Sequence, residues 1–262
     1  MSIALHADIY VSRVSPIHQW AVRPKLLSLL TLMFAIALVQ HLAIIPWVLG
    51  VVGSLYLCSR LPLRYLLHRL PYPGVFIVAM VGLLPFVSGE TVLWQWQGIA
   101  LRLEGLQTAA LVAGRFLAIL TTGFILLGTT PFLDMLKALR SLGLPSLLTD
   151  MALLTYRYLF DIASQLLTMQ QAMRLRGYGW MRQTLRRQWG WTVSLFGSLL
   201  LRSYERSQRV YKAMRLRGYG YGLSATYTAS SHSPSGITFV ATGLTLLAAL
   251  SFVLGEWMLT YL

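Results

Sequence analysis

Residues 26–58 form an apolar run of 33 residues without a charged side chain. As a single helix the run would be about 50 Å long, at about 1.5 Å per residue. One crossing of a bilayer takes only about 20 apolar residues. The run therefore predicts two transmembrane spans, over 26–41 and 44–59, with a tight turn near His41 and Pro46.

The composition of the whole chain also places most of it in lipid. Of the 262 residues, 56% are hydrophobic and only 11% are charged, whereas soluble domains carry about 25% charged residues. Further apolar segments predict spans over 73–89, 106–129 and 237–259. The sequence therefore predicts an all-α integral membrane protein with about five transmembrane helices, plus a cytoplasmic set of long amphipathic helices.

This pattern divides the chain into four regions. Residues 1–129 are an N-terminal membrane region with four spans, and residues 130–220 are the amphipathic region. A polar connector over 221–236 follows, and residues 237–262 contain the last span. The single cysteine, Cys58, excludes a disulfide within the chain.

Basic residues are concentrated after the fourth span. Of 22 Lys and Arg residues, 14 lie between positions 131 and 236, with only four acidic residues among them. Five spans place this segment, the N-terminus and the loop with Arg60, Arg64 and Arg69 on one face of the membrane. Because Lys and Arg accumulate in cytoplasmic loops, we predict a plasma-membrane protein with its N-terminus and residues 130–236 in the cytoplasm and its C-terminus outside.

Arg115 lies inside the fourth predicted span, in the stretch LVAGRFLAIL. A charged residue within a span is by default a candidate functional residue. The alternatives are that Arg115 pairs with a carboxylate or water inside the helix bundle, or that its side chain extends to the membrane surface. The sequence leaves these alternatives open.

The amphipathic region predicts three helices. TTPFLDMLKALRSLGLP begins with Thr-Pro and reaches Gly143, which is typical of a short amphipathic helix with clear ends. A second helix runs about 30 residues to Gly177 without an interior Gly or Pro, and a third, over about 185–217, ends at Gly218. Both long helices mix apolar with charged residues, which favours an interface at the membrane surface.

The octapeptide AMRLRGYG occurs twice, at 172–179 and at 213–220. Each copy lies at the C-terminal turn of a long predicted helix. Gly177 and Gly218 suit the left-handed conformation that ends a helix, and arginines at that end interact favourably with the helix dipole. Helix termination alone does not require eight identical residues, so the repeat predicts two equivalent contacts with a partner.

The sequence lacks the motifs of common catalytic chemistry. It contains no G-x-x-x-x-G-K-[ST], no H-E-x-x-H and no G-x-S-x-G, and its five histidines are scattered singly. We therefore predict a non-catalytic protein that hydrolyses no nucleotide itself and holds neither a metal nor a cofactor.

Taken together, these features resemble the transmembrane T component of energy-coupling factor transporters, most closely the cobalt/nickel-type subgroup. The resemblance covers nearly the whole chain and is most specific from Thr129 to Gly220. The family's first, second and third coupling helices are similar to TTPFLDMLKALRSLGLP, LTYRYLFDIASQLLTMQQAMRLRG and LLLRSYERSQRVYKAMRLRGYG.

The resemblance implies a subunit that joins two cytoplasmic ABC-type ATPases to a small substrate-binding membrane subunit, the S component, with no nucleic acid as partner. In the family, the central arginine of each short motif enters a groove with acidic contacts on one ATPase. The family motif is commonly Ala-Arg-Gly, whereas leucine precedes the arginine at both places here. The identical motifs predict an identical or closely similar ATPase pair. The implied coupling residues are Leu175, Arg176, Gly177, Leu216, Arg217 and Gly218, with Arg174 and Arg215 in support.

Two other functions stay open at the level of sequence. A membrane-embedded enzyme acting on lipid-linked substrates would use the arginines to bind phosphate, but it needs a placed acid, base or metal cluster. A basic tether would gain about 1 kcal/mol per Lys or Arg near an anionic lipid surface. Such a tether is indifferent to sequence, so it does not require two identical octapeptides.

Overall fold

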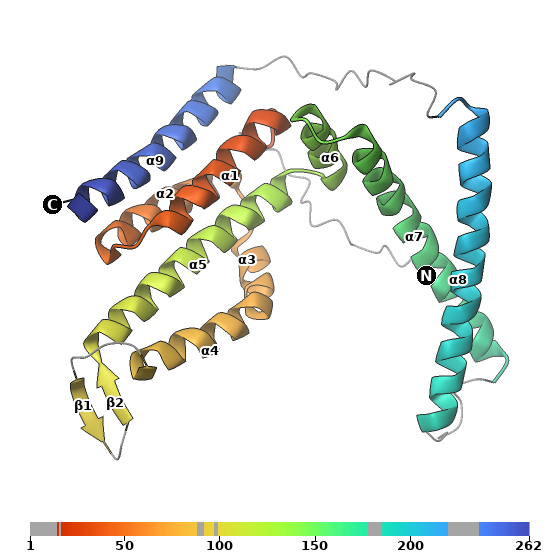
Figure 1. The fold of residues 1–262 in the computed structure, drawn as a ribbon, viewed down its shortest axis with the longest axis horizontal. Helices are drawn as coiled ribbons and strands as arrows, with labels where there is room; N and C mark the ends of the chain where they lie inside the picture. The colour runs from red at the N-terminus through yellow and green to blue at the C-terminus, as the bar shows by residue number, and fades with distance from the viewer. Residues whose placement is uncertain are drawn as a thin grey trace. The chain divides into compact units, whose positions relative to one another are not determined.

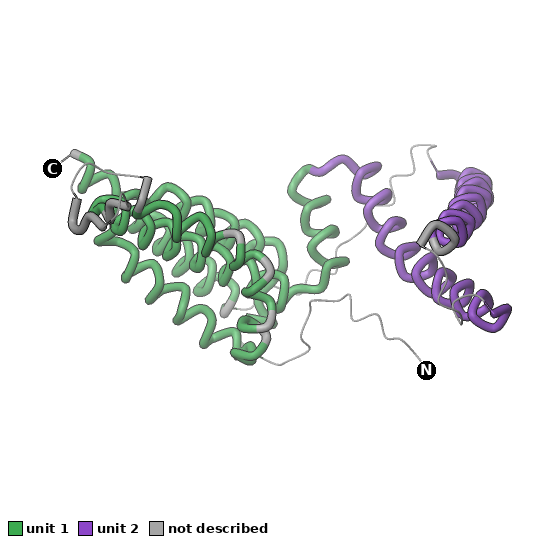
Figure 2. Tube along the Cα trace, turned by 90° about the horizontal axis from the view of Figure 1, so that it is seen from below, with its two compact units in different colours: residues 1–143, 230–262 green, residues 144–229 purple. Residues whose placement is uncertain are grey.

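The computed structural model describes residues 15, 17–87, 92–96, 99–177, 185–219 and 236–261 of the chain. Its contacts group the chain into unit 1, residues 1–143 and 230–262, and unit 2, residues 144–229 (Figure 2). In chain order the elements are α1 (Val22–Leu38), the 3-10 turn η1 (Leu42–Ile44), α2 (Ile45–Ser59), α3 (Leu63–Arg69), α4 (Pro71–Val87), β1 (Val92–Trp96), β2 (Ile99–Arg102), α5 (Leu103–Thr129), α6 (Phe132–Ser141), α7 (Ser146–Leu175), α8 (Leu185–Leu216) and α9 (Gly236–Tyr261) (Figure 1).

Helices make up nearly all of the described structure, which confirms the predicted all-α fold class. The segment between α4 and α5 contains the short antiparallel strands β1 and β2, with Trp96 paired to Ile99. The structure also adds α3, whose seven residues are too few to show a periodic pattern in the sequence. The short amphipathic helix predicted to end near Gly143 is confirmed as α6.

The apolar run over 26–58 folds as two helices, as its length predicts. α1 ends at Leu38, and α2 begins at Ile45 directly after η1. Pro46 lies in the first turn of α2, where its missing N–H removes no hydrogen bond of the helix. The chain therefore reverses within a few residues, and α1 and α2 both pack against α5.

α5 is the central helix of unit 1. It contacts α1, α2 and α4, and α1 packs in turn against α9 (Figure 1). Between helices in lipid, association depends on close van der Waals packing rather than on removal of apolar surface from water. The core shared by α1, α2, α5 and α9 includes Leu29, Leu32, Ile36, Val48, Ala118 and Phe252.

Gly114 of α5 allows a close approach of this helix to the start of α2. A Cβ on residue 114 would lie 2.6 Å from Cγ2 of Ile45, which is closer than real Cβ contacts. Ile45 is buried and branched at Cβ, so its side chain has little freedom to move away. The missing side chain at position 114 is therefore part of the packing between α5 and α2.

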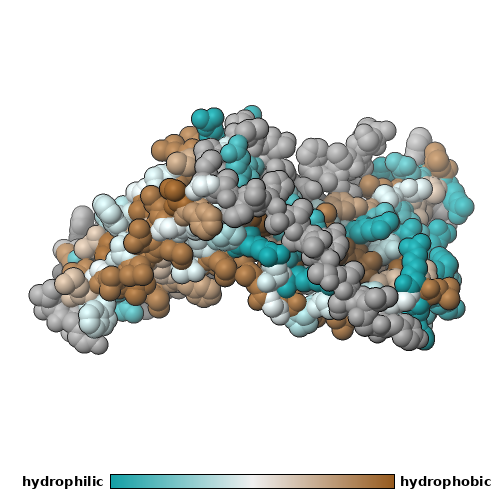
Figure 3. Space-filling view, turned by 90° about the horizontal axis from the view of Figure 1, so that it is seen from above, coloured by the Kyte–Doolittle hydropathy of each residue, from teal (hydrophilic) through white to brown (hydrophobic). Residues whose placement is uncertain are grey.

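Three described helical segments are long and apolar enough to cross a membrane, namely Leu42–Ser59, Leu103–Thr129 and Thr238–Thr260. α1 and α4, which correspond to the other two predicted spans, have 17 residues each. At about 1.5 Å per residue each is about 26 Å long, close to the hydrocarbon thickness of about 30 Å. Hydrophobic residues cover much of the face of unit 1 that Figure 3 shows. The count of five spans stays a prediction.

Lys25, in the first turn of α1, is buried at one end of unit 1. Its Nζ donates to the carbonyl oxygens of Ile17 at 3.1 Å and Thr129 at 3.3 Å. A buried ammonium group requires such partners, because burial removes its hydration. The two bonds join the segment before α1 to the last residue of α5. α6 follows at once and packs on α1, so it groups with unit 1 and apart from α7 and α8.

We predict that Gly114→Ala lowers the stability of unit 1, because the added methyl group must displace Ile45. Overpacking of this kind costs about 1–3 kcal/mol. Thermal unfolding of the purified protein in detergent measures the effect. Gly123→Ala in the same helix is the control, since its Cβ would meet only Met33 Cε at 3.8 Å. Equal midpoints for the two variants would contradict the packing role of Gly114.

Candidate functional site

The two octapeptides lie at the ends of the two long helices of unit 2. α7 begins directly after Pro145 and contains no Gly or Pro before its end. α8 begins at Leu185, as predicted, and is continuous through Gly190 and Gly197. Each octapeptide therefore begins in the last turn of an uninterrupted helix of about 30 residues.

The two helix ends have the same backbone geometry. In each, the N–H of the second arginine donates to the alanine carbonyl four residues earlier at 3.2 Å. The glycine N–H then donates to the carbonyl of the first arginine at 3.0 Å. Gly177 and Gly218 have φ values of +84° and +81°, the left-handed conformation that glycine adopts without strain. The predicted helix-ending role of both glycines is confirmed.

Both ends present an arginine and a leucine to the surroundings. Leu175 is 90% exposed and Leu216 is 89% exposed, and the arginines of the two motifs are exposed as well. In the described part of the chain, no ion pair involves Arg176 or Arg217. An exposed leucine beside an unpaired arginine, repeated at the same position of two helices, is a surface suited to an acidic groove with an apolar wall. We call residues 174–177 and 215–218 the first and second arginine motifs.

The two arginine motifs lie at opposite ends of α7. The Tyr219 hydroxyl donates to Asp150 Oδ2 at 3.1 Å, which places the second motif beside the first turns of α7. Arg176 follows Asp150 by 26 residues along this helix. At about 1.5 Å per residue, the two motifs are about 40 Å apart. The same octapeptide is thus presented at two well-separated places of one unit.

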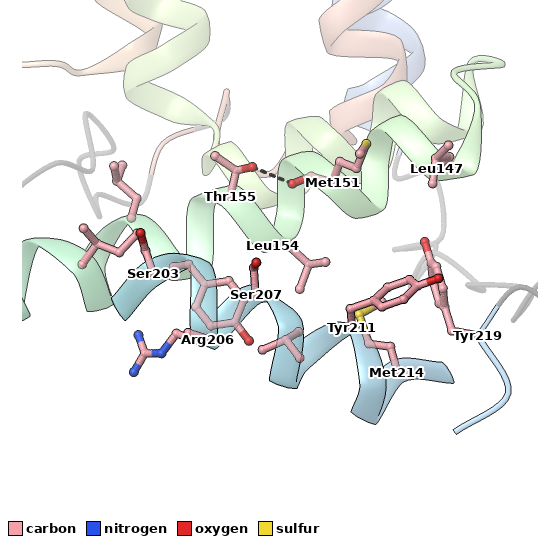
Figure 4. A pocket seen from close by; sticks show the side chains of 14 residues that line it. Leu147, Met151, Leu154, Thr155, Ser203, Arg206, Ser207, Tyr211, Met214 and Tyr219 are labelled. Carbon is pink, nitrogen blue, oxygen red and sulfur yellow. Dashed lines mark hydrogen bonds between the residues drawn. The ribbon is translucent and has the colours of Figure 1, made fainter. Parts of the chain in front are cut away.

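A groove runs between α7 and α8 (Figure 4). Its volume is about 620 Å³, and most of its wall is apolar. Arg206 pairs with Asp161 at 3.5 Å and lies 5.8 Å from the centre of the Tyr158 ring. The lining includes Leu147, Met151, Leu154, Tyr158, Arg206, Tyr211, Met214 and Tyr219.

Arg115 is not part of this site. It lies in α5 of unit 1, where its guanidinium donates to the carbonyl of Val39 just beyond the end of α1. The adjoining turn is also held by Glu256 of α9, which accepts from the His41 backbone N–H at 3.4 Å and contacts the His41 ring at 2.6 Å. Of the two alternatives, the structure shows a partner inside the bundle, which is a backbone carbonyl rather than a carboxylate.

Sequence reasoning missed two residues of this site, Asp150 and Tyr219. Tyr219 belongs to the second octapeptide, but the repeat gave no sign of its partner 69 residues away. Asp150 is one of only four acidic residues in the basic segment. The scarcity of acidic residues in this segment was the one feature of the sequence that could have pointed to Asp150. The corresponding Tyr178 of the first octapeptide lies outside the described residues.

Three helices long and apolar enough to cross a membrane define a membrane protein, and this one also carries an exposed basic motif at two helix ends. Comparison with known proteins identifies the family. The profile of the cobalt transport protein family CbiQ matches residues 13–228. The chain therefore belongs to this family, and the family together with the relatives below identifies it as a T component of an energy-coupling factor transporter of the cobalt/nickel type.

Individual relatives agree with this assignment. The chain is 27% identical over 229 residues to the cobalt transport protein CbiQ of Rhodobacter capsulatus, covering 86% of this chain and 90% of that protein. It is 32% identical over 213 residues to the nickel permease LarQ of Lactiplantibacillus plantarum, with coverages of 79% and 69%. It is 26% identical over 229 residues to the energy-coupling factor transporter transmembrane protein EcfT of Brevibacillus brevis, with coverages of 83% and 85%.

We predict that Gly218→Ala loosens the last turn of α8, because alanine in the left-handed conformation costs about 1–2 kcal/mol. Such a cost corresponds to an increase of about 5- to 30-fold in amide exchange. Hydrogen–deuterium exchange of residues 213–217 measures it. Gly190→Ala in the interior of α8 is the matched control, since open space surrounds that position. Gly190→Ala should slow amide exchange in α8, because alanine favours a helix more than glycine does. A change of the exchange rate in the same direction in both variants would contradict the prediction.

Proposed function

We propose that this chain is the coupling subunit of an ATP-driven importer, linking two cytoplasmic ATPases to a substrate-binding membrane subunit. The observation that carries the proposal is the pair of identical, exposed arginine motifs about 40 Å apart on one helical unit. Two equivalent contacts on one chain suit two equivalent partner subunits. The ATPases would therefore be identical or closely similar to each other.

The proposed cargo is a cobalt or nickel ion. The names of the relatives support this choice, since one is a cobalt transport protein and another a nickel permease. In this arrangement the S component carries the substrate site, and the chain described here carries none. Residues 130–236 and the N-terminus would face the cytoplasm, where the ATPases are, and the C-terminus would lie outside.

The mechanism follows from the chemistry of the arginine motifs. Arg176 and Arg217 would each donate charge-assisted hydrogen bonds to carboxylates in a groove of one ATPase. The exposed Leu175 and Leu216 would contact the apolar wall of the same groove. When ATP binding draws the two ATPases together, the arginine-bearing ends of α7 and α8 follow. Reorientation of these helices would then change the access of the S component to its substrate.

The two alternative functions differ from this proposal in what they require. In the described residues, no group of three or more His, Cys, Asp or Glu could hold a metal ion. An anionic-lipid tether would depend on total charge and would weaken smoothly with salt. Coupling to ATPases should instead depend on the two central arginines.

We predict that Arg176→Ala/Arg217→Ala abolishes recovery of an ATPase with the tagged protein from its native membrane. Truncation of one partner of a hydrogen-bonded charge pair costs about 2–5 kcal/mol, or about 30-fold or more in affinity. The measurement is a detergent pull-down, followed by quantification of ATPase activity and of the co-purified subunits.

Arg202→Ala/Arg209→Ala is the matched control, because it removes the same charge from exposed positions of α8 outside both motifs. The proposal requires that this control retains the ATPase. Equal loss in both variants would indicate a charge-dependent tether. Full recovery with the motif variant would mean that the arginines only end their helices, and no ATPase with either variant or wild type would overturn the transporter assignment.

A further inference from the structure

The two aspartates of α7 bond to α8 and to the turn that follows it. Asp150 accepts from the Tyr219 hydroxyl at 3.1 Å, and Asp161 pairs with Arg206 at 3.5 Å. The two acids are 11 residues apart, which is close to three helical turns, so they lie on one face of α7. Their partners Tyr219 and Arg206 both line the groove (Figure 4).

These two bonds are of different kinds. Arg206 and Asp161 are both about half exposed, at 41% and 50%, and a solvated pair of this geometry contributes little. Tyr219 is held through both its side chain and its backbone. Its hydroxyl bonds to Asp150, and its backbone N–H donates to the Met214 carbonyl at 3.1 Å. Gly218 makes this return possible, because its positive φ turns the chain back toward α7.

We propose that Tyr219 is the positioning residue of the second arginine motif, because its hydroxyl bond to Asp150 fixes the end of α8, and with it Arg217, to the first turns of α7. The inference rests on the proposed function and deepens it. α7 has no interior Gly or Pro and spans the distance from Asp150 to Arg176 as one helix. Once Tyr219 is bonded to Asp150, the length of α7 sets the separation of the two ATPase contacts.

The consequence for coupling is a fixed spacing. If the second motif were free, Arg217 would follow its ATPase groove without moving α7. With the bond in place, a displacement of one groove relative to the other acts on α7 as a whole. Loss of this solvent-exposed hydrogen bond shifts the equilibrium between the docked and undocked ends by about 2- to 12-fold. Transport per ATP would fall by a similar factor while Arg217 could still bind.

The test uses the full-length protein in lipid nanodiscs, with spin labels at Gln171→Cys and Lys212→Cys. These exposed residues directly precede the two octapeptides, so they report on both motifs without altering them. Cys58→Ala removes the single native thiol. Pulsed electron–electron double resonance then gives the distribution of distances between the labels.

We predict one narrow distribution in this background and a broader one in Tyr219→Phe, which removes only the hydroxyl oxygen. Asp150→Asn should keep the narrow distribution, because the amide oxygen still accepts from the tyrosine, whereas Asp150→Ala should broaden it. Tyr211→Phe is the matched control, since it lines the same groove and, within the described residues, its hydroxyl forms no hydrogen bond.

An unchanged distribution in Tyr219→Phe would overturn the proposal, and so would equal broadening in Tyr211→Phe. The assembled transporter supplies the second readout. Tyr219→Phe should retain its ATPases in a pull-down but transport less substrate per ATP, whereas the Arg176→Ala/Arg217→Ala variant should lose them. Retention of ATPases by the arginine variant would remove the proposed function and leave the distance result standing, so the two failures are distinguishable.

Discussion

The need to satisfy backbone hydrogen bonds away from water governs the architecture of unit 1. Helices meet this need internally, but each helix end leaves carbonyl and N–H groups without partners. At the turn between α1 and α2, Arg115 supplies a donor to Val39 and Glu256 an acceptor to His41. At the end of α5, Lys25 donates to Thr129. The few charged side chains inside this unit therefore serve the ends of its helices.

The same constraint is met differently in unit 2. α7 and α8 end at glycines whose left-handed conformation lets the chain return its own N–H groups to the last carbonyls. No arginine side chain is needed for this closure. Within the described residues Arg176 and Arg217 form no ion pair, and the adjacent leucines are exposed with them. Membership in the family and the two exposed arginine motifs support the proposed coupling function independently of each other.

Much of this protein could be predicted from its sequence, for reasons that are local. The length of the 26–58 run required two helices, and Gly177 and Gly218 marked the ends of two more. The identical octapeptides indicated two equivalent contacts, because identity over eight residues is visible without a structure. Arg115 could be singled out as a charged residue in a span, but its partner could not. The partner is the backbone carbonyl of Val39, and every residue has such a carbonyl, so the sequence does not identify it.

What the sequence alone determined is the class of fold, the helix ends and the two arginine motifs, all of which depend on residues close together in the chain. Only the tertiary structure decided which distant residues meet. It grouped α6 with unit 1, placed Ile45 against Gly114, and brought Tyr219 to Asp150. Such pairs join separate helices, and a helical periodicity specifies which face is apolar but not which neighbour covers it. The separation of the two motifs follows from one of these pairings, so it could not be obtained from the sequence.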